Sequence, residues 1–246
     1  MVRPWRRAAP RPAEETVARP RTAIELDGVS HAYGERPVLE DVTVVLTEHR
    51  VGVIGSNGSG KSTLARLLNG LVLPTAGRVL VDGLDTATDL RAVRRRVGFV
   101  FQDPDAQIVH PTVAEDVAFG LTNQRVPAPE RQTRVAEVLT RYGLADHADH
   151  PAHLLSGGQK QLLAIAGVLV MRPARVVFDE PTTLLDLANR RRVAQVIEDL
   201  EQDVVVVTHD LDLLAGFDRV LVVEDGRVVA DGAPAETVDW YVDRMS

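Results

Sequence analysis

The sequence contains no cysteine and few aromatic residues, and both shortages narrow the chemistry open to it. Among its 246 residues, 4% are aromatic and none is cysteine. Without thiols the chain cannot use a cysteine nucleophile, a cysteine-ligated zinc or a cysteine-ligated iron–sulfur cluster. A core drawn from 45% hydrophobic residues needs no disulfides at this length. These absences fit a reducing compartment and one large domain, with or without an inserted subdomain.

Long hydrophobic runs are also missing. The longest, Leu162–Met171, has ten residues, whereas a membrane-spanning helix needs roughly 20. The first residues contain no apolar stretch of the kind that a secretory signal carries. We therefore expect that any role at a membrane depends on a partner subunit.

Lysine is nearly absent, because Lys61 and Lys160 are the only two and arginine supplies every other cationic side chain except histidine. The two residue types are not equivalent, since the lysine ammonium is compact and the arginine guanidinium is a planar fork. Each retained lysine therefore indicates a position that arginine cannot fill. The net charge of −7 argues against a general nucleic-acid-binding protein.

The charge is concentrated unevenly along the chain. Residues 1–22 carry six arginines against two glutamates, a net charge of +4 that leaves −11 on the rest. Four prolines in this segment prevent a regular helix, so it is predicted to be a disordered tail. An electrostatic contact with a membrane and a dispensable extension both remain open for it.

Short apolar runs alternate with helical patterns after this tail. Those at 51–54, 176–178 and 204–208 are continuously apolar, which is typical of parallel strands covered on both faces. The earlier strands alternate polar and apolar residues, which predicts a small antiparallel sheet. Helical patterns at about 61–70, 130–142, 157–171 and 187–201, with a shorter one at 112–120, complete an α/β fold. Residues of about 103–160 are expected to form a helical subdomain.

A glycine-rich loop follows the strand at 51–54. It matches the phosphate-binding pattern GxxxxGK[ST] at every fixed position and precedes a helix, as that loop requires. Its glycines let backbone N–H groups turn toward phosphate oxygens, and the helix N-terminus adds a positive dipole end. Lys61 is expected to contact the β- and γ-phosphates, and Ser62 a Mg²⁺ ion. The predicted nucleotide-binding residues here are Gly55, Ser56, Asn57, Gly58, Ser59, Gly60, Lys61, Ser62 and Thr63.

Two adjacent carboxylates end the apolar strand at 176–178. Side chains alternate along a strand, so Asp179 and Glu180 diverge. This pair predicts Asp179 as a Mg²⁺ ligand, direct or through water, and Glu180 as the general base for the attacking water. GTPases are excluded because neither lysine lies in an Asn-Lys-x-Asp motif.

A second anion-binding pattern lies at Leu155-Ser156-Gly157-Gly158-Gln159, before a helical stretch. A serine and two glycines at a helix start offer free N–H groups and a small hydroxyl. A second phosphate site in one chain is redundant unless it faces the phosphate-binding loop of another subunit.

Together these motifs resemble the ATP-binding cassette (ABC) ATPase family over roughly residues 24–232, whose signature motif is the run 155–159. The resemblance implies a P-loop ATPase core with a small antiparallel subdomain and a helical subdomain, in an ABC ATPase domain over residues 23–246. It also implies ATP and Mg²⁺ as ligands and a head-to-tail dimer, each ATP lying between one subunit's loop and residues Ser156, Gly157, Gly158 and Gln159 of the other.

The same resemblance assigns four further residues. Tyr33 would stack on adenine, and Gln102 would touch Mg²⁺ and the attacking water. Asp186 would contact the opposite subunit, and His209 would contact the γ-phosphate. Glu180, His209 and Gln102 are thus the predicted catalytic residues, and Ser62, Gln102 and Asp179 the predicted metal-binding residues.

The sequence around Gln102, with residues 111–120 and 179–187, is similar to ATPases of energy-coupling factor (ECF) importers of vitamins and transition-metal ions. The shorter form, without the long C-terminal extension, resembles those of biotin and cobalt or nickel systems. This implies a scaffold subunit with a basic helix docking near Gln102–Asp116, a membrane-embedded substrate-binding subunit and a place on the cytoplasmic face of the membrane. Acidic residues there would contact that helix or simply be solvated: Asp103, Asp105, Glu115 and Asp116. Another ABC transporter and a soluble ATPase of the iron–sulfur assembly type remain alternatives.

Overall fold

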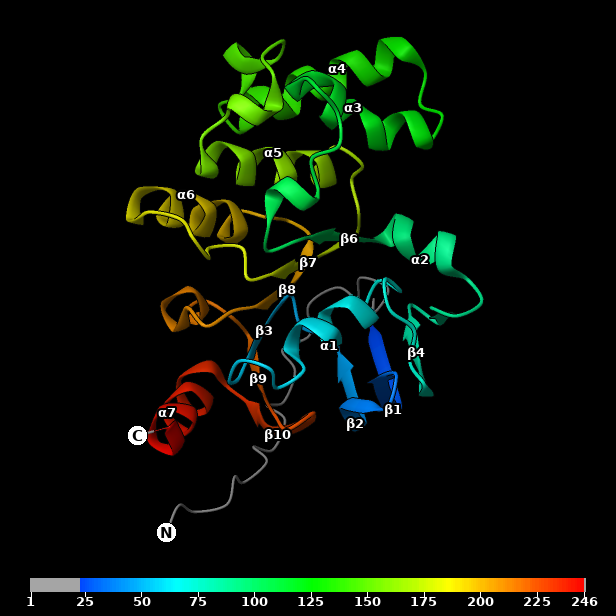
Figure 1. The fold of residues 1–246 in the computed structure, drawn as a ribbon, viewed down its shortest axis with the longest axis vertical. Helices are drawn as coiled ribbons and strands as arrows, with labels where there is room; N and C mark the ends of the chain where they lie inside the picture. Colours follow the sequence, from blue (N-terminus) through cyan, green and yellow to red (C-terminus); the bar gives the residue numbers. More distant parts are fainter. Residues whose placement is uncertain (1–22, 246) are drawn as a thin grey trace, which may run out of the picture.

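A computed structural model describes residues 23–245, so the predicted tail at 1–22 lies outside the described residues. The described chain contains two sheets and a group of helices at one end (Figure 1). None of the helices in this range combines the length and the apolar character needed to cross a bilayer.

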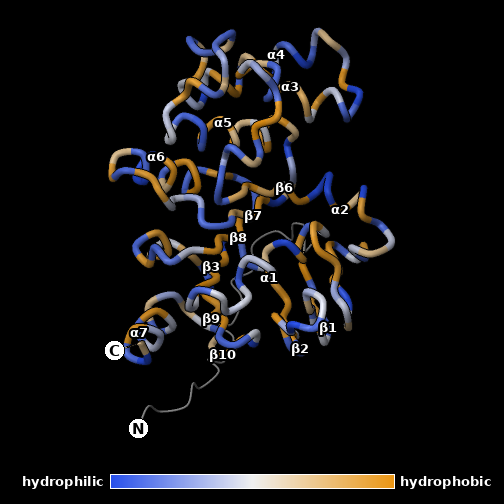
Figure 2. Tube along the Cα trace, viewed as in Figure 1, coloured by the Kyte–Doolittle hydropathy of each residue, from blue (hydrophilic) through white to orange (hydrophobic). Residues whose placement is uncertain are grey.

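The larger sheet has six strands in the order β10-β9-β3-β8-β7-β6, with β10 antiparallel at one edge and the other five parallel. Its central strands are the continuous apolar runs of the sequence, and Figure 2 shows their hydrophobic colour. The bounds are β3 Arg50–Ile54, β6 Val97–Val100, β7 Arg175–Asp179, β8 Asp203–Val207, β9 Arg219–Glu224 and β10 Arg227–Gly232.

Both faces of this sheet are buried, which explains why its strands do not alternate with polar residues. Along β8, Val204 and Val206 pack into a core shared with the helices α3–α6, whereas Val205 and Val207 pack into a second core with α1 and the smaller sheet. Residues following the carboxyl ends of β3, β6, β7 and β8 meet at one edge of the sheet, where open α/β sheets bind ligands.

The smaller sheet is antiparallel, as predicted, in the order β2-β1-β4-β5. Its hairpin pairs Tyr33 with Arg36 and so places both beside the larger sheet's ligand edge. Its bounds are β1 Ile24–Tyr33, β2 Arg36–Leu46, β4 Ala76–Val81 and β5 Leu84–Asp85.

Most of the chain between β6 and β7 is helical, and α3, α4 and α5 lie together at one end of the molecule (Figure 1). α5 packs against both α3 and β6, so this group is joined directly to the sheet. The α-helices are α1 Lys61–Leu67, α2 Leu90–Arg96, α3 Val113–Asn123, α4 Ala128–Arg141, α5 Gly157–Leu169, α6 Leu187–Glu198 and α7 Pro234–Met245. Short 3-10 turns are η1 Pro104–Ala106, η2 Ala145–His147, η3 Ala152–Leu154 and η4 Leu211–Leu214.

The elements α2, α7 and β5 were not predicted from the sequence. Along α2 a single residue, Val93, is buried, so no apolar period marks the helix. Among the side chains of α7, Thr237 alone is buried, although the helix packs on β9 and β10. α1 and α6 end three residues earlier than predicted, at Leu67 and Glu198.

Candidate functional site

A cleft of about 630 Å³ lies at the carboxyl edge of the parallel strands and reaches the β1–β2 hairpin. Residues far apart in the sequence meet there, because β3, β6, β7 and β8 deliver them to the same edge. The predicted residues that line it are Tyr33, Asn57, Gly58, Gly60, Lys61, Ser62, Thr63, Gln102, Glu180 and His209. The cleft therefore brings together most of the phosphate-binding loop with the predicted base and histidine.

The loop after β3 has a backbone that glycine alone accommodates easily. Gly55 has φ +148, and a Cβ there would lie 2.0 Å from the carbonyl oxygen of Val223. Gly60 has φ +106, and its Cβ would lie 2.7 Å from the carbonyl oxygen of Val38. Among residues 23–245 the buried hydroxyl of Ser59 finds no hydrogen-bond partner. A concave backbone with an unpaired buried donor fits a phosphate group.

Lys61 is buried at the start of α1 with 6% of its surface exposed. Its Nζ donates hydrogen bonds to the carbonyl oxygens of Gly55 at 2.8 Å and Ser56 at 2.7 Å. Burial lowers the pKa of the ammonium group, and Glu180 and Asp179 partly oppose this. An ammonium that is costly to bury gains from a strongly anionic ligand.

Asp179 ends β7 with 1% of its surface exposed and faces the loop. Its Oδ1 accepts a hydrogen bond of 2.8 Å from the Ser62 hydroxyl, and its Oδ2 lies 3.7 Å from Arg66. Burial raises the pKa of the Asp179 carboxyl, while the Ser62 hydrogen bond and Arg66 lower it. A hydroxyl and a carboxylate side by side are hard oxygen donors of the kind that Mg²⁺ prefers.

Glu180 follows directly and is held from three sides. Its φ of +52 lies in the left-handed region, and its N–H donates to the carbonyl of Val207 at 2.8 Å. Its Oε2 lies 2.7 Å from Nδ1 of His209 and accepts a hydrogen bond of 3.3 Å from the Thr183 hydroxyl. Glu180 is 8% exposed and lines the cleft, so its carboxylate can meet a water molecule there while His209 fixes its orientation.

The signature residues begin α5 and lie elsewhere. Ser156 is the N-cap, and a capping box joins its side chain and N–H to Gln159. Asp186 is the N-cap of α6, and its side chain accepts hydrogen bonds from the backbone N–H and the side chain of Asn189. Within the described part of the chain, the residues that line the cleft include neither the signature motif at 155–159 nor Asp186. Leucines beside them are strongly exposed: Leu154 71%, Leu184 96% and Leu187 60%.

Residues 39–183, more than half of the chain, match the ABC transporter family. The chain belongs to this family. An ABC transporter ATP-binding protein of Deinococcus radiodurans is 64% identical over 223 residues, which are 91% of this chain and 99% of that protein. The biotin transport ATP-binding protein BioM of Rhizobium etli is 47% identical over 218 residues, 89% of this chain and 97% of that one.

A solved structure agrees with the sequence comparisons. CbiO1 of Clostridium perfringens, part of the ABC transporter complex CbiONQ, superposes with a TM-score of 0.78 at 33% identity, covering 90% of this chain and 93% of its own. The ABC ATPase fold predicted from the motifs is thereby confirmed, and with it an ATP-hydrolysing, nucleotide-binding chain.

The cleft of this ABC ATPase also involves residues that no motif of the sequence marks as site residues. Arg36, Val38 and Thr183 also line it. Asp210 follows His209, and its carboxylate pairs with Arg190 of α6 at 2.6 Å, tying the histidine's loop to the helix that Asp186 caps. Arg36 lies opposite Tyr33 in the β1–β2 hairpin, and this pairing was the signal that could have placed it at the cleft. Nothing in the spacing of Arg190 and Asp210 predicts their contact.

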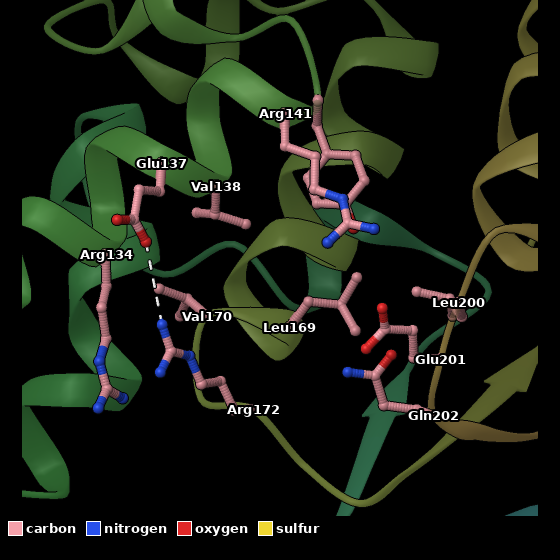
Figure 3. Close-up of a pocket in the computed structure, with 11 residues that line it drawn as sticks. Arg134, Glu137, Val138, Arg141, Leu169, Val170, Arg172, Leu200, Glu201 and Gln202 are labelled. Atoms are coloured by element: carbon pink, nitrogen blue, oxygen red, sulfur yellow. Dashed lines mark ion pairs between the residues drawn. The ribbon is translucent and has the colours of Figure 1, made fainter.

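A second cavity of the ABC ATPase, about 330 Å³, lies between α4, the end of α5 and residues 200–202 (Figure 3). The guanidinium of Arg172 faces the carboxylate of Glu137 at 3.9 Å. None of the predicted site residues lines it, and its charges have both signs. The nucleotide cleft is therefore the candidate active site.

Proposed function

We propose that the chain is the ATP-hydrolysing subunit of an ECF-type importer and energises uptake of a vitamin such as biotin, or of a transition-metal ion, through separate membrane subunits. The observation that carries the ATPase chemistry is the meeting of Lys61, Ser62, Asp179, Glu180 and His209 around one cleft. The names of the relatives, a biotin transport and a cobalt import ATP-binding protein among them, favour import over the other ABC classes.

The cleft residues have separate roles in this proposal. The loop N–H groups and Lys61 bind the phosphates, and Ser62, Asp179 and Gln102 hold Mg²⁺, which neutralises phosphate charge when bound. Glu180 accepts the proton of the attacking water at its carboxylate, while His209 and Thr183 keep that carboxylate oriented. Tyr33, with 48% of its surface exposed at the hairpin end of the cleft, stacks on adenine.

The signature residues act on a second copy or a paralogue in this proposal. Their absence from the cleft lining and the exposed leucines beside them support a head-to-tail dimer, in which Ser156, Gly157, Gly158, Gln159 and Asp186 complete the partner's site. Two cations and two nucleotides would then lie between the subunits.

The membrane scaffold docks near Gln102–Asp116, on the cytoplasmic face of the membrane. A groove of about 1250 Å³ between α2, β6, α3 and α5 supports this, with Leu71, Val109 and Phe119 exposed along it. Its cationic lining consists of Arg91, Arg94, Arg95 and Arg125.

The four acidic residues of this region all have partners within the chain. Asp103 caps η1, Glu115 accepts hydrogen bonds from Thr112 in the capping box of α3, and one Asp116 oxygen accepts two backbone N–H groups. Asp105 pairs with Lys160. A basic scaffold helix would therefore meet carboxylates that are already engaged and four arginines of its own sign, so its contact with the groove would depend on the exposed apolar side chains.

Capture of the tagged chain from mildly solubilised native membranes tests the proposal, with mass spectrometry of proteins and bound small molecules and an ATPase assay. A multi-span scaffold with a small membrane-embedded binding protein is the expected result. A periplasmic-type binding protein or an exporter-like pair would instead favour another ABC transporter. Recovery only from the soluble fraction would contradict the importer.

A further inference from the structure

Lys160 is the second of only two lysines, and the nucleotide site does not use it. It lies in α5 one turn after Ser156, whose carbonyl accepts its backbone N–H at 2.8 Å. Its side chain is 17% exposed, so the ammonium is held against the protein instead of extending into solvent.

Its partner belongs to the loop that carries Gln102. Lys160 Nζ donates to Asp105 Oδ1 at 2.7 Å, and Asp105 lies in η1, three residues after Gln102. The contact engages one carboxylate oxygen, which suits a compact ammonium better than a planar guanidinium fork.

A second contact, made by Gln107, also connects the Gln102 loop to α5. The side chain of Gln107 accepts a hydrogen bond from the N–H of Phe101 and donates one to the carbonyl of Ala164 in α5, each at 3.0 Å. The side chain of Gln107 thus joins the start of the segment 101–107 to its end and connects that end to α5, with Gln102 and Asp105 within the closed segment.

We propose that the Asp105–Lys160 pair makes the Gln102 loop and the signature end of α5 move as one body. In the dimer proposed above, on which this inference rests, Gln102 belongs to a chain's own site and Ser156 to the site of its partner. A shift of Gln102 at one nucleotide is then transmitted to the other nucleotide through the pair. Lys160 and Asp105 are positioning residues and touch neither ligand.

The pair contributes little to stability, because Asp105 is 63% exposed and exposed ion pairs are weak. Lys160→Met and Asp105→Asn should therefore fold with unchanged melting temperature and bind ATP as the parent does. We expect each variant to lower kcat about fivefold, which is the scale of a typical coupling between sites. We also expect the Hill coefficient for ATP to fall toward 1. Steady-state ATPase assays on the purified full-length chain, with a fluorescent ATP analogue for affinity, measure both.

Exchanging the two charges of the pair distinguishes a loss of coupling from a local defect at either residue. The double variant Asp105→Lys with Lys160→Asp should recover most of the lost kcat and cooperativity. Glu40→Gln, which breaks the equally short Arg227–Glu40 pair on the surface, should change nothing. Full activity and cooperativity in both single variants, or no recovery on reversal, would overturn the inference. An inactive parent chain would instead count against the proposed function.

Discussion

Two charged side chains of the nucleotide cleft, Lys61 and Asp179, are almost completely buried. Burial disfavours the charged form of each, which lowers the pKa of Lys61 and raises that of Asp179. Both side chains form hydrogen bonds with the loop. Lys61 donates to two loop carbonyls, and Asp179 accepts from Ser62. In the proposed function, the phosphates would be the favourable partner of Lys61, and the cation that of Asp179, which within the chain lies 3.7 Å from Arg66.

Asp179→Asn should stabilise the chain when nucleotide and Mg²⁺ are absent. The raised pKa means that the folded state holds a proton more tightly than the unfolded one, so its stability falls as pH rises above the ordinary value of 3.8. Asparagine still accepts the Ser62 hydrogen bond and carries no charge. We expect the melting temperature to rise by about 2–4 °C at pH 8, and by less toward acidic pH.

Thermal unfolding in EDTA at pH 8 and pH 5 measures this change. Asp27→Asn, at an exposed ion pair of the smaller sheet, serves as the control and should leave the melting temperature unchanged. A lower melting temperature of Asp179→Asn at pH 8 would contradict the argument. The same variant should lose Mg²⁺-dependent hydrolysis.

Glu180→Gln should separate binding from chemistry. The amide oxygen can still accept hydrogen bonds from His209 and Thr183, so the cleft keeps its shape, but it cannot take a proton from water. We expect ATP affinity to be retained and turnover to fall about 100-fold or more, the scale of losing a general base. Single-turnover hydrolysis, with the exposed Glu201→Gln as control, measures it. Undiminished turnover would remove Glu180 from the role of base.

At the scale of elements, the start of α5 lies close to the start of α6 at a single glycine, Gly158, which faces Asn189. A Cβ on Gly158 would lie 2.1 Å from the side chain of Asn189, whereas a Cβ on Gly157 would meet nothing within 4 Å. Asn189 in turn donates to Asp186. The close approach at Gly158 thus joins the signature motif to the cap of α6.

The two glycines should respond differently to alanine. Gly158→Ala must displace Asn189 and its hydrogen bonds to Asp186, and we expect the free energy of unfolding to fall by about 1–3 kcal/mol. Gly157→Ala should stay within about 0.5 kcal/mol of the parent. Urea unfolding of the full chain compares them directly. Equal losses in both variants would show that the contact with Asn189 does not set the cost.

Elements with a clear apolar pattern were predictable, and those without one were not. The strands around Val53, Phe178 and Val206 are buried on both faces, so their residues alone reveal them. α2 buries one side chain and has no such pattern, whereas α7 packs its partly buried Val238, Trp240 and Tyr241 on the core but buries only Thr237 fully. Within the site, contiguous motifs such as the phosphate-binding loop could be located from sequence. Contacts such as Lys160 with Asp105 depend on tertiary packing, which spacing does not contain.

At the scale of the whole molecule, the phosphate-binding loop and the signature motif of one chain do not line the same cleft. Lys61 lies in the cleft, while Ser156 caps α5 outside the cleft lining. If each site combines the loop of one subunit with the signature motif of another, a variant in the loop and a variant in the signature motif should restore activity to each other when the two chains form a dimer. Damage to a site within one chain cannot be repaired in this way.

Lys61→Ala and Ser156→Glu provide this test. Each variant alone forms dimers in which both sites lack one half, so both should hydrolyse ATP at background rate. Random mixing makes about half of the dimers mixed, and each mixed dimer contains one site with Lys61 and Ser156 both intact, so up to about a quarter of the parental activity should return, and less where coupling to the damaged site slows the intact one. The rate of the mixture is followed as the ratio of the two proteins varies, with differently tagged chains captured to verify mixed dimers. A maximum near equal amounts supports the composite site, because only pairing across chains supplies both halves. Captured mixed dimers without recovered activity would contradict it, since the loop and the signature would then have to act within one chain.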